Sequence, residues 1–252
     1  MTDLSAFSLD GRTVLVTGTN TGIGQGIAIA AARAGARVLG VGRSDMGETA
    51  RMIPSGQFDP IMCNLADLEA AREMLDQAWQ AHGPIDGLVN NAGIIRRADA
   101  TDHTEDDWDA VMDTNLKTLF FLCQRYGRRV LASGRNGKIV NIASVLSLQG
   151  GIRVAGYTAS KHGVAGVTQL LANEWAGRGI NVNAVSPGYV ESNNTTALRA
   201  DPDRSAAILS RIPAGRWGKP ADIGDAVVFL LSRAADYVHG ANIPVDGGWL
   251  AR

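Results

Sequence analysis

Short runs of β-branched and aliphatic residues alternate with longer amphipathic stretches along the chain. Residues 14–16 and 38–41 do not alternate with polar positions, which is typical of strands buried on both faces. The pattern predicts strands over residues 13–17, 37–41, 58–62, 87–90, 138–142, 180–185 and 242–245. It predicts helices over residues 22–34, 67–82, 105–133, 157–178 and 220–231.

Strands that alternate with helices predict βαβ units and a parallel sheet. We therefore expect an α/β fold with one domain over residues 1–252, a doubly wound parallel sheet of seven strands with helices on both faces. Ligands of such sheets bind beyond the carboxyl ends of the strands. Thr104, three residues before Asp107, is the expected N-cap of the helix over residues 105–133.

Composition narrows the class of protein. The 252 residues are 45% apolar and 19% charged with a net charge of −1, which indicates a globular protein without the basic surface of a nucleic-acid or membrane binder. The first twelve residues have no apolar core, which argues against a signal peptide and predicts a cytoplasmic location. Cys63 and Cys123 are interpreted as reduced core residues, and the four scattered histidines predict no metal site.

A glycine-rich turn follows the first predicted strand, in residues 17–24 (Thr-Gly-Thr-Asn-Thr-Gly-Ile-Gly). Glycines allow a tight turn and a close approach of a pyrophosphate to the backbone, and the following helix offers free N–H groups. The spacing is Gly-x-x-x-Gly-x-Gly rather than Gly-x-Gly-x-x-Gly, so a simple strand–helix turn without a ligand is the alternative.

A second signal is Tyr157, four residues before Lys161 on one face of a predicted helix. A cation about 4 Å from the phenol contributes roughly 4 kcal/mol, or roughly three pKa units, so we expect Lys161 to lower the Tyr157 pKa. Ser144 follows a predicted strand and is expected to hold a substrate oxygen beside the phenol. A chance Tyr–Lys spacing and a plain turn serine are the alternatives.

In their order along the chain these motifs, with Asn90-Asn91-Ala92-Gly93, Asn115 and Pro187-Gly188, resemble the short-chain dehydrogenase/reductase family. The resemblance implies a Rossmann-type fold, bound NAD(P) and hydride transfer to or from a carbinol or ketone carbon. It implies that Tyr157 is the acid/base, Ser144 positions the reacting oxygen, Lys161 holds the nicotinamide ribose, and Asn115 anchors a proton-relay water. The implied cofactor-binding residues also include Gly18, Asn20, Thr21, Gly22, Ile23, Gly24, Asn64, Leu65, Asn91, Ala92, Gly93, Pro187, Gly188, Val190 and Ser192. The family usually has Asp at the position of Asn64, so the contact to adenine is altered.

Residues 149–154, 187–195, 212–217 and 245–252 resemble one group in that family, the 2-deoxy-D-gluconate 3-dehydrogenases, also called 2-dehydro-3-deoxy-D-gluconate 5-dehydrogenases. The resemblance implies a small anionic polyol as substrate and a homotetramer. Arginines after strand ends suit a carboxylate, and surface charges are the alternative. The candidate substrate residues are Arg96, Arg97, Gln149, Arg153, Asn193 and Asn194.

The choice of cofactor depends on the end of the second predicted strand. NAD-specific sites usually carry a carboxylate there for the ribose 2′-hydroxyl, whereas this chain has Gly42, Arg43 and Ser44. Arg43 and Ser44 favour a 2′-phosphate and therefore NADP(H). Thr21 is not basic and the resembling dehydrogenases often use NAD(H), so we expect both cofactors to bind. Arg43 stacked on adenine is the alternative role.

Three other functions fit parts of the pattern. A 3-oxoacyl carrier-protein reductase or another short-chain polyol dehydrogenase would keep the same catalytic residues. A non-catalytic dinucleotide-binding protein would tolerate loss of Tyr157, Lys161 or Ser144, and all three are present.

Overall fold

A computed structural model describes residues 4–252. It contains seven strands, β1 Thr13–Thr17, β2 Arg37–Gly42, β3 Phe58–Met62, β4 Gly87–Asn90, β5 Gly137–Ile142, β6 Ile180–Pro187 and β7 Asn242–Val245. All seven predicted strands are confirmed; β2, β5 and β6 are each one or two residues longer than predicted. The strands form one parallel sheet in the order β3-β2-β1-β4-β5-β6-β7. The predicted doubly wound fold is therefore confirmed.

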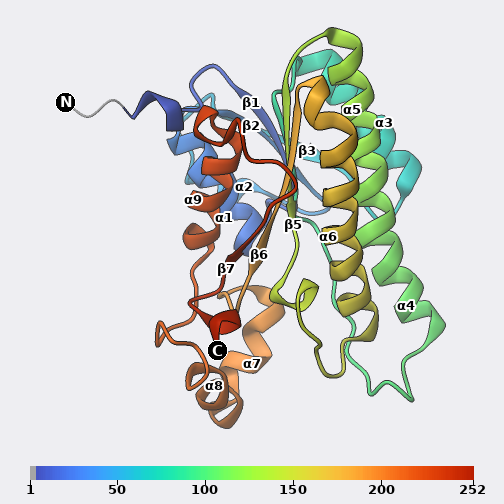
Figure 1. Ribbon diagram of the computed structural model, residues 1–252, viewed down its shortest axis with the longest axis vertical. Helices are drawn as coiled ribbons and strands as arrows, with labels where there is room; N and C mark the ends of the chain where they lie inside the picture. Colours follow the sequence, from blue (N-terminus) through green and yellow to red (C-terminus); the bar gives the residue numbers. More distant parts are fainter. Residues whose placement is uncertain (1–3) are drawn as a thin grey trace.

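The helices are α1 Gly22–Arg33, α2 Gly47–Arg51, α3 Leu68–His82, α4 Glu105–Met112, α5 Leu119–Ser133, α6 Ala155–Trp175, α7 Thr196–Ala200, α8 Pro202–Leu209 and α9 Pro220–Leu231. One apolar core lies between the sheet and α3, α5 and α6, and a second lies between the sheet and α1 and α9. In Figure 1 these two groups of helices flank the sheet, and α7 and α8 lie with the C-terminus beyond the carboxyl ends of the strands.

The predicted helix over residues 105–133 begins as expected, since the Thr104 hydroxyl accepts a hydrogen bond from the Asp107 N–H (3.2 Å). Its middle is different, because Asp113–Thr118 forms a π-helical turn between α4 and α5. The helix predicted over residues 157–178 begins two residues earlier and ends in a 3₁₀ turn. The short helices α2, α7 and α8 were not predicted.

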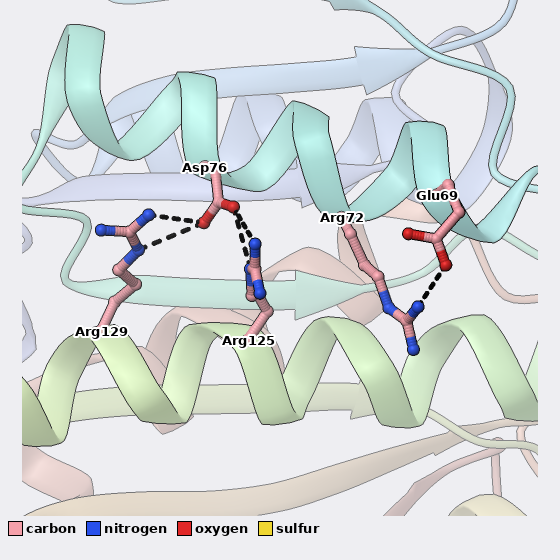
Figure 2. Close-up of polar contacts among 5 residues, drawn as sticks. All are labelled: Glu69, Arg72, Asp76, Arg125 and Arg129. Atoms are coloured by element: carbon pink, nitrogen blue, oxygen red, sulfur yellow. Dashed lines mark hydrogen bonds and ion pairs between the residues drawn. The ribbon is translucent and has the colours of Figure 1, made fainter.

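Ion pairs join two helices on one face of the sheet. Asp76 of α3 binds both Arg125 and Arg129 of α5, while Glu69 pairs with Arg72 within α3 (Figure 2). The Arg129 Nη2–Asp76 Oδ1 distance is 2.8 Å. The two guanidinium groups hold the Asp76 pKa below its usual value, Arg125 having the larger effect.

Candidate active site

Ser144 and Tyr157 meet at the carboxyl end of β5. Ser144 is buried, and its Oγ accepts a hydrogen bond from the Leu146 N–H (3.1 Å). Burial of the Tyr157 phenol has the largest effect on its pKa and raises it above the ordinary value. The neighbouring Ser144 side chain and the charge of Arg97 lower the Tyr157 pKa in part.

Lys161 lies one helical turn after Tyr157 on α6. Its Nζ donates to the Ile142 carbonyl (2.6 Å) and lies 5.5 Å from the centre of the Tyr157 ring. Burial lowers the Lys161 pKa to about 8. The expectation that Lys161 lowers the Tyr157 pKa is wrong, because the groups that lower it are Ser144 and Arg97, while the Lys161 ammonium is directed at the Ile142 carbonyl.

Two serines that the sequence analysis missed hold this group together. Ser147 Oγ donates to the Lys161 carbonyl (2.7 Å) and accepts from the Ser144 N–H (3.3 Å), so it ties the serine turn to α6. Ser186 Oγ lies between the Ser144 carbonyl (2.9 Å) and Asn242 Oδ1 (2.7 Å). Ser186 directly follows a predicted strand, which is its only signal in the sequence, and Ser147 has no such signal.

Asn115 lies in the π-helical turn and is buried. Its Oδ1 accepts from the Ile94 N–H (2.8 Å), and its Nδ2 donates to the Ile94 carbonyl (2.9 Å) and to Ser160 Oγ (3.3 Å). The amide therefore fixes the segment after β4 against α6. The water-anchoring role remains a prediction.

The glycine turn has the shape that a dinucleotide requires. Gly18 and Gly22 have positive φ angles of 75° and 60°, and Gly24 leaves no room for a side chain beside the Gly18 carbonyl. Thr21 makes no side-chain cap on α1, and α1 has no acidic residue in its first turn. The N–H groups of Gly22, Ile23 and Gly24 at this helix end therefore suit a pyrophosphate.

Other candidate cofactor residues line the same edge of the sheet. Thr17, missed in the sequence analysis, accepts at its hydroxyl from the Asn91 and Ala92 N–H groups (2.9 and 3.0 Å), which joins the ends of β1 and β4. The remaining residues lie in loops after strands: Asn64 and Leu65 after β3, Gly93 after β4, and Gly188, Val190 and Ser192 after Pro187 at the end of β6.

The structure separates the three candidate arginines. Arg96 pairs with Asp107 and Arg153 pairs with Asp99, both at 3.0 Å and on the surface. Arg97 forms no ion pair within residues 4–252. Its Nη2 donates to the Asn194 carbonyl (3.0 Å), and its charge lowers the Tyr157 pKa. The free cation of the site is thus Arg97 rather than Arg96 or Arg153.

The loop after β6 reaches across the site. Asn193 Nδ2 donates to Thr21 Oγ1 (3.2 Å), while the Asn194 carbonyl accepts from Arg97 as described above. Tyr189 packs against the rings of Trp217 and Trp249, which anchors the loop to the C-terminal segment. Gln149 is half-buried after the Ser144 turn.

The family model described as Enoyl-(Acyl carrier protein) reductase matches residues 18–250. The chain belongs to the short-chain dehydrogenase/reductase family. It is 53% identical to the 2-dehydro-3-deoxy-D-gluconate 5-dehydrogenase of Escherichia coli strain K12 over 99% of both chains. A protein from Agrobacterium tumefaciens solved with bound NADP is 59% identical, with a TM-score of 0.94 over 98% of this chain and 99% of that one. The gluconate 5-dehydrogenase of Burkholderia cenocepacia J2315, solved with NADP and tartrate, is 38% identical, with a TM-score of 0.93 over 99% of each chain.

Membership of this family makes the protein an NAD(P)-dependent oxidoreductase of alcohols and ketones. Within residues 4–252 no group of His, Cys, Asp and Glu side chains is arranged to hold a metal ion. Over the same residues, none of the helices has the length and apolar character to cross a bilayer.

Proposed function

We propose that the protein interconverts a secondary alcohol and a ketone of a keto-deoxy sugar acid, in the class of 2-dehydro-3-deoxy-D-gluconate and 2-deoxy-D-gluconate. The proposal rests mainly on Arg97. This cation has no acidic partner within residues 4–252, and its charge lowers the Tyr157 pKa. A guanidinium at this place suits the carboxylate of a small acid. The 53% identity to the E. coli dehydrogenase supports the compound class.

Tyr157, Ser144 and Lys161 each have a different role in the proposed reaction. NADP(H), when bound, supplies or accepts the hydride. In the direction of reduction, the Tyr157 phenol donates a proton to the carbonyl oxygen, and the Ser144 hydroxyl stabilises the developing negative charge by a hydrogen bond. The Leu146 N–H holds Ser144 Oγ in place for this role. Lys161, bound to the Ile142 carbonyl, places a positive charge beneath the phenol.

We infer a preference for NADP(H) over NAD(H). Arg43 is exposed and forms no ion pair within the described residues, and the end of β2 carries no carboxylate for a ribose 2′-hydroxyl. We also propose that the single domain over residues 1–252 acts as a homotetramer in the cytoplasm. The two cysteines, buried and free, suit a reducing compartment.

Arg97→Ala and Arg153→Ala form a matched test of the substrate proposal. Loss of a charge-assisted pair costs roughly 2–5 kcal/mol, so Arg97→Ala is expected to lower kcat/KM for 2-dehydro-3-deoxy-D-gluconate by roughly 30-fold or more. Arg153→Ala should change it less than about threefold, because Arg153 already pairs with the exposed Asp99.

The measurement is kcat/KM with the sugar acid and with acetoacetyl thioester, followed through NADPH absorbance. Equal effects of the two substitutions would remove Arg97 from the substrate site. Faster turnover of the thioester than of any keto-deoxy sugar acid would favour a 3-oxoacyl reductase and would contradict the proposed function.

A further inference from the structure

The side chain of Asn20 connects the glycine turn to the loop after β2. Its Nδ2 donates to the Ser44 carbonyl, to Ser44 Oγ (2.9 Å) and to the Asp45 carbonyl (3.3 Å). Backbone carbonyls only accept hydrogen bonds, so these contacts require the NH₂ group of the amide to face the loop. Asn20 therefore fixes the backbone of the loop that contains Arg43 and Ser44.

The same amide fills the space beside Gly42, the last residue of β2. A Cβ added at Gly42 would overlap Asn20 Oδ1 and lie 2.8 Å from Nδ2. A carboxylate side chain cannot stand at Gly42 while Asn20 keeps its place. Many NAD(H) sites carry a carboxylate at the end of this strand to bind the ribose 2′-hydroxyl. Asn20 therefore excludes such a carboxylate at Gly42, and the same side chain holds the loop that carries Arg43.

The rest of this loop is also tied to the glycine turn. Thr19 Oγ1 donates to the sulfur of buried Met46 (3.0 Å), and Thr49 Oγ1 donates to the Thr19 carbonyl (2.7 Å). Gln25 of α1 donates to Thr49 Oγ1 (3.0 Å). The loop is therefore fixed at two places without Asn20, so loss of the Asn20 amide should release Arg43 and Ser44 without unfolding the loop.

We propose that Asn20 is a positioning residue for cofactor choice, which selects NADP(H) by holding Arg43 and Ser44 where a ribose 2′-phosphate binds and by blocking a carboxylate at Gly42. The proposal rests on the inferred preference for NADP(H). Asn20 acts through the loop and not by reading the phosphate itself, because its NH₂ group is committed to Ser44 and Asp45.

The test measures the dissociation constants of NADPH and NADH by calorimetry on the protein without sugar acid. Asn20→Ala should weaken NADPH roughly tenfold and NADH less than about threefold. Asn20→Asp has the same shape but opposes two carbonyls and adds negative charge, so it should weaken NADPH roughly 30-fold or more. Asn64→Ala is the matched control: it alters the expected adenine contact, shared by both cofactors, and should leave the ratio of their dissociation constants unchanged.

A double substitution separates positioning from a merely structural role. If Asn20 acts through Arg43, Asn20→Ala combined with Arg43→Ala should bind NADPH about as weakly as Arg43→Ala alone. Fully additive losses, or equal weakening of NADPH and NADH by Asn20→Ala, would overturn the proposal. A wild-type protein that binds NADH more tightly than NADPH would instead refute the inferred cofactor preference, and turnover of the sugar acid is not involved in either result.

Discussion

Tyr157 and Lys161 make different contacts, so substitution of each residue is expected to have a different effect on activity and stability. Tyr157 is half-buried and its phenol neighbours the Ser144 side chain, so its ring and its hydroxyl have separate roles. Lys161 is buried with its charge against a single carbonyl, which is unfavourable for folding in the absence of other partners. The site thus carries a charge that serves chemistry rather than stability.

Tyr157→Phe should abolish turnover while NADPH still binds. The substitution keeps the ring but removes the proton donor, so kcat is expected to fall by roughly 10²–10⁴-fold. The NADPH dissociation constant should change less than about threefold. Tyr237→Phe is the matched control, because Tyr237 is fully exposed. A Tyr157→Phe protein with activity within about tenfold of wild type would contradict the assignment of Tyr157 as the acid/base.

Lys161→Met should change how stability depends on pH. The Lys161 pKa falls from 10.5 to about 8 in the folded protein, so the folded state loses its proton first as pH rises. The penalty for the buried charge is present below pH 8 and is relieved as pH rises toward 10.5. At 1.36 kcal/mol per pKa unit, the free energy of unfolding of wild type relative to Lys161→Met should rise by about 2–3 kcal/mol between pH 7.5 and 10.

Urea unfolding of both proteins across this pH range measures the difference. A constant difference would show that Lys161 has the same pKa in the folded and unfolded states.

The residue types of the catalytic site were predictable from sequence, but their partners were not. Three arginines after strand ends looked equivalent as carboxylate ligands, and only the folded chain brings Asp107 to Arg96 and Asp99 to Arg153. The contacts of Asn20 were likewise not predictable, since Ser44 and Asp45 are far from it along the chain. Tertiary contacts of this kind leave no periodic signal.

At the scale of elements, the central strands were predictable because they are short, apolar and buried on both faces, whereas β3 and β7 at the two edges of the sheet are only partly buried. β1 and β2 show this in their burial, with polar flanks that mark their limits. The helices α2, α7 and α8 have five to eight residues, and helices this short depend on docking against the rest of the chain. The π-helical turn was not predicted either, because it continues directly from α4 into α5 and contains no glycine or proline that would mark it in the sequence.

The ion pairs of Asp76 link α3 to α5, and Asp76 is only 17% exposed. Asp76→Asn keeps the shape of the side chain but removes the charge that binds Arg125 and Arg129. The variant should be less stable by about 1–2 kcal/mol at pH 7, after allowance for the half-exposed arginines. Asp113→Asn, in an exposed pair with Lys117, is the control and should cost less than about 0.5 kcal/mol.

The pH dependence of Asp76→Asn has a definite sign. Because the Asp76 pKa is lowered in the folded protein, its contribution is present above the ordinary pKa of 3.8 and is lost as pH falls through the lowered value. The stability difference between wild type and variant should therefore shrink below about pH 4. Chemical unfolding at pH 7 and at pH 3 measures it, and an equal difference at both values would rule out the ion pairs as its source.

For the whole molecule, one exposed face is unusual. The exposed residues of α6 are His162, Gly166, Gln169, Leu170, Asn173 and Glu174, and the one charged residue among them, Glu174, lies in the last turn of the helix. Leu170 is 47% exposed. An exposed helix face normally carries several charges, so the small and uncharged residues that precede Glu174 on this helix suit close packing against a second copy of the chain.

The proposed homotetramer can be tested through this face. A side chain at Gly166 would meet nothing within 4 Å in the single chain, so Gly166→Arg should leave the fold and its thermal stability as a monomer intact. If α6 packs against α6 of a second copy, the arginine should disrupt that contact and reduce the tetramer to dimers or monomers. Gly177→Arg is the matched control, because Gly177 is equally open but follows α6 next to the charged Arg178. Light scattering after size exclusion at micromolar protein gives the mass of the wild type and of both variants. A monomeric wild type would contradict the proposed tetramer. A Gly166→Arg protein that is still a tetramer would show that α6 is not part of the tetramer interface.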